Sequence, residues 1–77
     1  MNEYQVYEQV RDLMPDSVDR GPAEMDADNG EPLNAILALL ACSEVPIPSE
    51  VIDRLHEVYP DGGIRKDIDD LIAAAAS

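Results

Sequence analysis

Apolar residues recur at intervals of three and four in four short segments of this sequence, and proline or glycine separates one segment from the next. This spacing puts apolar side chains on one face of an α-helix, whereas a half-buried strand would require strict alternation. Proline also disfavours helical geometry in the residue before it, so it sets the ends of these segments. We predict an all-α fold, a small bundle of three to four helices at about residues 2–14, 31–44, 49–59 and 64–76, in a single domain of residues 1–77.

The helical spacing also predicts which side chains face the core. The inward residues are Val6, Tyr7, Val10, Leu13 and Met14 in the first helix, Leu33, Ile36, Leu37 and Leu40 in the second, Val51, Ile52, Leu55, Val58 and Tyr59 in the third, and Ile64, Ile68, Leu71, Ile72 and Ala75 in the last. Leu39 and several small residues make the second helix apolar on nearly every side. Such a helix belongs in the middle of a bundle or at a subunit interface. A homodimer through Leu33 to Cys42 is therefore one prediction.

Residues 15–30 differ in character from the rest of the chain. They hold two prolines, two glycines and five acidic residues, with few apolar side chains. We predict a long acidic loop there between the first two helices, with room for one short helical turn at about residues 22–26, where Pro22 could occupy a first-turn position.

The net charge of -12, from 17 acidic and 5 basic residues, excludes several functions. Nucleic acid is held mainly by Lys and Arg that neutralise phosphates, so we expect no nucleic-acid ligand. The same argument excludes a basic membrane-surface module, and the longest apolar run is about half the length needed to span a bilayer. No signal peptide is recognisable, and a single cysteine cannot form an internal disulfide. We expect a soluble cytoplasmic protein.

Motifs for chemistry are weak in this sequence. Cys42 and His56 are each the sole member of their type, whereas a metal site needs three or four ligands. Residues 26–31 resemble a calcium loop, but the glycine and the glutamate of that loop fall at the wrong positions. The layout resembles acyl carrier proteins, yet Glu31 and Pro32 occupy the place of the serine that would carry the cofactor arm. We therefore predict no enzyme activity and no catalytic, cofactor-binding or metal-binding residues.

The acidic residues themselves are the candidate functional feature. Six lie between residues 16 and 31, and three more share the face of the third helix opposite its apolar stripe. A concentrated negative field suits the steering and binding of a cationic protein surface. The predicted partner-binding residues are Asp16, Asp19, Glu24, Asp26, Asp28, Glu31, Glu50, Asp53 and Glu57. Solubility alone, or adaptation to high salt, is the simpler interpretation of the same charge.

Two stretches of the sequence resemble a known family. Residues 30–40, GEPLNAILALL, and residues 45–55, VPIPSEVIDRL, are similar to the small MafI-like immunity proteins of bacterial polymorphic toxin systems. In that family a Gly-Glu-led apolar helix is followed by a Val/Ile-Pro-Ile/Leu connector and a helix opening Ser/Pro-x-Glu. The family's aromatic residues near positions 41–44 are absent. The resemblance implies an inhibitor that binds and neutralises a cognate toxin, often a nuclease with a basic groove.

Three other functions stay open at the level of sequence. A phage or mobile-element inhibitor that mimics DNA would have the same acidity. A helical homodimer could serve a regulatory or structural role. A carrier-like domain without the attachment serine could act as a docking scaffold.

Overall fold

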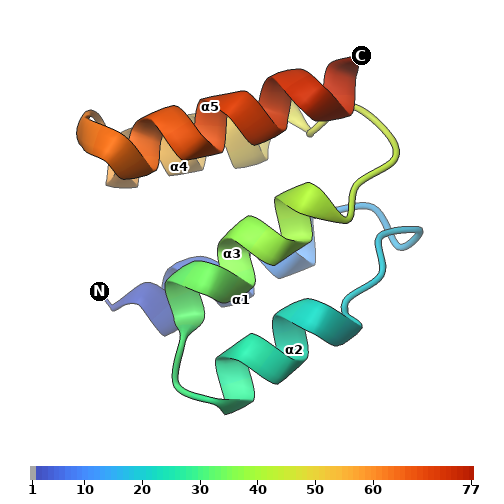
Figure 1. The fold of residues 1–77 in the computed structure, drawn as a ribbon, viewed down its shortest axis with the longest axis vertical. Helices are drawn as coiled ribbons and strands as arrows, with labels where there is room; N and C mark the ends of the chain where they lie inside the picture. Colours follow the sequence, from blue (N-terminus) through green and yellow to red (C-terminus); the bar gives the residue numbers. More distant parts are fainter. Residues whose placement is uncertain (1) are drawn as a thin grey trace.

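The computed structural model describes residues 2–77, and its regular secondary structure there is entirely helical (Figure 1). The helices are α1 (Glu3–Leu13), α2 (Gly21–Asp28), α3 (Pro32–Ala41), α4 (Ser49–Val58) and α5 (Gly62–Ala76). The all-α prediction is confirmed. The described residues form five helices, however, so the predicted number of three to four is too low.

The first helix begins where the sequence predicts. Asn2 Oδ1 accepts the backbone N–H of Gln5 at 3.0 Å, and Gln5 Oε1 accepts that of Asn2 at 3.1 Å. This reciprocal capping satisfies two N–H groups that have no partner inside the helix. At the other end, Met14 is extended in front of Pro15, as the proline requires.

The prediction of a long loop at residues 15–30 is wrong for half of its length, because α2 occupies residues 21–28 and extends the predicted turn at about residues 22–26. Pro22 lies in the first turn of α2, and Asp19 Oδ1 accepts the N–H of Gly21 at 2.9 Å just before it. The helix has almost no apolar stripe, which explains why its periodicity gives no signal. Its inward contact is Ala23, which is fully buried and lets α2 pack closely on α3. Gly30, at φ 80°, then turns the chain into α3.

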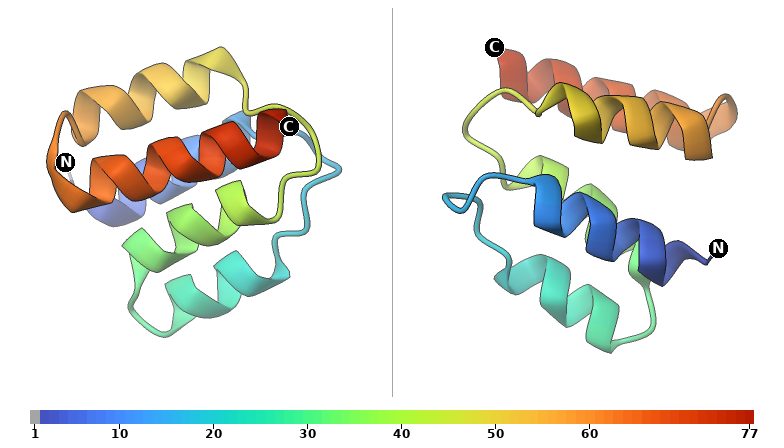
Figure 2. Two further views of the ribbon diagram at one scale, coloured as in Figure 1. Left: turned by 45° about the horizontal axis from the view of Figure 1, so that its top comes forward. Right: turned by 180° about the vertical axis from the view of Figure 1, so that it is seen from behind.

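The helices form a flattened molecule of 30 × 28 × 18 Å. In Figure 1, α5 and α4 lie at the top, α3 and α1 in the middle and α2 at the bottom, with α5 and α3 in front. The packed pairs are α2 on α3, α1 on α3, α3 on α5, α1 on α4 and α4 on α5. Figure 2 shows from behind that α1 and α4 run side by side in opposite directions.

Helix α3 contacts three other helices, which explains its apolar character on nearly every side. Its fully buried residues are Ala35, Ile36, Leu39 and Leu40, whereas Leu33 and Leu37 are half-buried. The predicted stripe is therefore rotated, because α1, α2 and α5 together bury a different arc of the helix. The helix also ends at Ala41 rather than near residue 44. The homodimer stays a prediction, which light scattering would test.

The last two helices enclose the remaining core. Val51 and Leu55 of α4 and Ile68 of α5 are fully buried. α4 begins at Ser49 directly after Pro48, as predicted. α5 begins at Gly62, two residues earlier than predicted, because the positive φ of 88° at Gly62 makes the turn within the helix's first residue. None of the helices in residues 2–77 has the length and apolar character needed to cross a lipid bilayer.

Candidate functional site

Six of the nine predicted partner-binding residues surround α2, and we call them the α2 acidic group. Asp16 and Asp19 precede the helix, Glu24, Asp26 and Asp28 belong to it, and Glu31 follows it. Asp19 Oδ1 accepts the N–H of Gly21, the first residue of α2, and an Asp16 oxygen lies 3.9 Å from Arg20 Nη2. Part of this group is therefore engaged in holding the connection between α1 and α2. Asp26 is half-buried and the other five are exposed.

The other three predicted residues lie elsewhere, on the face of α4 that looks toward α1. There the two helices line an open groove of about 600 Å³, which we call the α1–α4 groove. Its lining residues are Gln9, Asp12 and Leu13 from α1 and Glu50, Asp53, Arg54 and Glu57 from α4.

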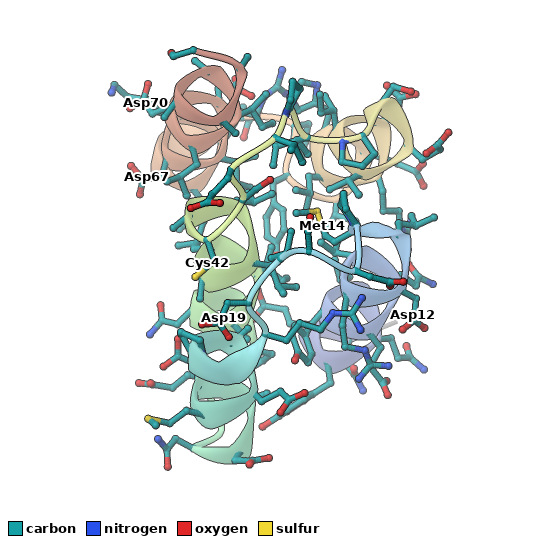
Figure 3. All side chains as sticks on the ribbon, turned by 90° about the vertical axis from the view of Figure 1, so that its right-hand side faces the viewer. Asp12, Met14, Asp19, Cys42, Asp67 and Asp70 are labelled. Atoms are coloured by element: carbon teal, nitrogen blue, oxygen red, sulfur yellow. The ribbon has the colours of Figure 1, made fainter. Side chains whose placement is uncertain are left out.

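The structure thus separates the predicted site into two surfaces. α2 packs on α3, and α4 packs on α1 and α5, so α2 and α4 lie at opposite ends of the molecule in every view (Figures 1 and 2). Figure 3 shows Asp12 on the outer side of α1, while Asp67 and Asp70 of α5 lie on the opposite side of the molecule. A single rigid partner surface could therefore contact the α2 acidic group or the α4 carboxylates, but not both at once.

Arg54 joins the two walls of the groove. Its Nε donates to Gln9 Oε1 of α1 at 2.8 Å, and its Nη1 donates to Glu57 Oε1 at 3.0 Å. The side chain is only 19% exposed, so its guanidinium is largely committed to these contacts. Arg54 therefore fixes the spacing of α1 and α4 rather than cancelling the charge of the whole groove.

The carboxylates of the groove differ in their pairing. Glu57 is paired with Arg54, and Asp12 Oδ1 accepts from Arg11 Nε at 3.1 Å. Glu50 and Asp53 are both exposed, and neither belongs to the ion pairs of Arg11, Arg20, Arg54, His56, Arg65 and Lys66 described within residues 2–77. These two residues lie one turn apart on α4, so they place two exposed negative charges at one wall of the groove.

Sequence reasoning missed the α1 side of the groove. Leu13 is predicted to face the core, but it is 43% exposed in the last turn of α1. Gln9 and Asp12 are polar residues on the exposed side of α1, and Arg54 is not part of a recognisable sequence motif. Only the antiparallel pairing of α1 with α4 brings the three α1 side chains, Gln9, Asp12 and Leu13, opposite Glu50 and Asp53, and no spacing within one helix encodes that pairing.

A hydrogen bond closes one end of the α1–α4 pair. Tyr59 Oη, just after α4, donates to Glu3 Oε2 in the first turn of α1 at 2.7 Å. Burial of the phenol, together with this acceptor, raises the pKa of Tyr59 well above its ordinary value. Tyr59 therefore stays a neutral donor over the whole physiological range.

His56 forms part of a second connection, between α4 and α5. Its Nε2 lies 2.7 Å from Asp69 Oδ1, and Arg65 Nε donates to Asp69 Oδ2 at 2.9 Å. His56 belongs to α4 whereas Arg65 and Asp69 belong to α5, so no spacing within one helix predicts this connection. The hydrogen bond from His56, followed by that from Arg65, lowers the pKa of Asp69 below its ordinary value.

The contacts of Asp69 with His56 and Arg65 predict that acid lowers the free energy of unfolding. Because the pKa of Asp69 is lowered in the folded state, its contribution is complete above the unfolded value of about 3.9 and is lost as the pH falls through the folded value. In Asp69→Asn, the free energy of unfolding should fall less steeply between about pH 4.5 and 2.5. Urea unfolding at several pH values measures this slope. The control Asp67→Asn, an exposed carboxylate on the same helix, should keep the wild-type slope; equal slopes in all three proteins would contradict the prediction.

The net charge predicts how added salt changes stability. Repulsion among 17 carboxylates opposes a compact state, and salt screens charges at the surface. We expect the melting temperature to rise by about 4–8 °C between low salt and 0.3 M NaCl, which corresponds to about 1 kcal/mol in a domain of this size. Thermal unfolding followed by circular dichroism provides the measurement. A melting temperature that falls over this range would contradict the prediction.

Residues 2–77 contain no candidate metal centre. No group of three or more His, Cys, Asp or Glu side chains in this part of the chain is arranged to hold a metal ion. Cys42 is half-buried at the end of α3.

Comparisons of the chain with protein families, curated proteins and solved structures found no match.

Proposed function

We propose that this chain is a non-catalytic acidic protein-binding module, an immunity-type inhibitor that neutralises a basic toxin or nuclease domain. The observation that carries the proposal is the α1–α4 groove, in which four carboxylates face one committed arginine on a chain of net charge -12. Complementary charge of this kind favours a cationic protein surface. The resemblance of residues 30–40 and 45–55 to MafI-like immunity proteins supports the same function.

Inhibition of this type needs no catalytic residue. The acidic surface attracts the basic substrate groove of the toxin, and the bound module then blocks access of the substrate. Long-range attraction raises the association rate, and contacts between desolvated groups set the dissociation rate. The complex is expected to be stoichiometric, with one module for each toxin domain.

Co-expression with a toxin-like domain encoded beside this chain tests the proposal. The proposal predicts a complex that survives purification at low salt, weakens as salt is raised, and abolishes toxin activity at a one-to-one ratio. Toxin activity that is unchanged at saturating module would contradict it. Capture of a host DNA-processing enzyme by the tagged module, with loss of that enzyme's DNA binding, would instead support the DNA-mimic function.

A further inference from the structure

The α1–α4 groove has the dimensions and lining of a site for a few side chains. Its volume of about 600 Å³ lies within the range of about 300–1,000 Å³ typical of pockets that bind small ligands. Most of the exposed lining is apolar, and Leu13 contributes an aliphatic side chain that is 43% exposed. An occupant would therefore place an apolar group against α1.

The charges around this apolar lining determine which residues of the occupant flank its apolar group. Glu50 and Asp53 are exposed, and Asp12 and Glu57 add negative charge on both walls. Guanidinium binds carboxylates through two parallel hydrogen bonds, which the ammonium of lysine cannot do. A second copy of this chain is a poor occupant because both copies would carry the same negative field.

We propose that the α1–α4 groove binds a short partner segment in which an apolar side chain is flanked by arginines. The apolar side chain packs on Leu13, and the arginines pair with Glu50 and Asp53. This inference rests on the proposed function, because it names the part of a basic partner that the module recognises. The α2 acidic group then contributes to long-range attraction and not to the contact itself.

Two synthetic hexapeptides test this assignment. Both carry three arginines; the other three residues are leucines in one peptide and serines in the other. Titration into the ¹⁵N-labelled full chain should show the arginine-leucine peptide binding about fivefold tighter, as burial of an apolar side chain predicts. Amide shifts should concentrate at residues 9–13 and 50–57.

Two variants separate the groove from exposed apolar surface in general. Leu13→Ser should lower the affinity for the arginine-leucine peptide to that for the arginine-serine peptide. Met25→Ser, which removes a still more exposed apolar side chain amid the α2 acidic group, should leave the fivefold preference intact. Because both positions are exposed, neither substitution is expected to unfold the chain, and circular dichroism checks this.

The outcomes distinguish failure of this inference from failure of the proposed function. Equal binding of the two peptides, with shifts centred on α2, would overturn the groove assignment and leave an acidic protein-binding module. Loss of the preference in Met25→Ser rather than in Leu13→Ser would do the same. If neither peptide shifts any resonance at low salt, both the groove assignment and charge-driven binding of a basic partner are wrong.

Discussion

Leu39→Ala is expected to lower the free energy of unfolding by about 3 kcal/mol, the cost of removing fully buried methyl groups and leaving a cavity. Leu39 is fully buried in α3, where α1, α2 and α5 converge. A core of this size supplies only about 3–5 kcal/mol in total. The variant should therefore be largely unfolded at 25 °C, which urea titration followed by circular dichroism at 222 nm measures.

Leu37→Ala is the matched control, since it removes the same atoms from the same helix. Leu37 is half-buried, so its loss should cost about 1 kcal/mol. The helical spacing in the sequence predicts the opposite order, with Leu37 on the buried stripe. A larger loss for Leu37→Ala than for Leu39→Ala would show that α3 is rotated relative to the structure described above.

The double charge reversal Glu50→Lys/Asp53→Lys is expected to weaken binding of the arginine-leucine peptide by about tenfold or more. Each exposed ion pair contributes up to about 1 kcal/mol, and reversal adds repulsion to the loss of both pairs. For a whole basic partner domain, the same change should also slow association and reduce its dependence on salt. Stopped-flow fluorescence at two NaCl concentrations measures that rate.

The chain offers a closely matched control, Glu24→Lys/Asp28→Lys. These two residues are exposed on one face of α2, and Glu24, like Glu50, lies in the first turn of its helix. Both double variants change the net charge equally and place a lysine where the helix dipole disfavours it. Any difference in peptide affinity between the two variants therefore results from the position of the charges and not from the net charge.

The sequence was sufficient to predict the elements that have strong apolar periodicity. α1 and α4 appear within one residue of their predicted bounds, since Asn2 caps the former and Pro48 directly precedes the latter. For α2 only a short turn at about residues 22–26 was predicted, because Ala23 is its buried contact and a helix that packs through a small side chain shows no stripe. The orientation of α3 likewise depends on three neighbours whose positions no local pattern encodes.

The candidate site was predicted only in part for the same reason. Glu50, Asp53 and Glu57 share one helix face, so their proximity follows from helical geometry alone. Their association with Asp12 and Leu13 comes from the antiparallel packing of α1 against α4, which is a tertiary contact. The separation of the α2 acidic group from the groove is likewise a property of the fold and not of the charge pattern.

The most direct test of the central claim compares the two charge-reversal variants by calorimetric titration with the arginine-leucine peptide. We predict that Glu50→Lys/Asp53→Lys loses affinity by about tenfold or more, whereas Glu24→Lys/Asp28→Lys loses about twofold through the change in net charge. Equal losses would show that total charge drives binding. A larger loss in the α2 variant would place the binding surface on the α2 acidic group and contradict the groove.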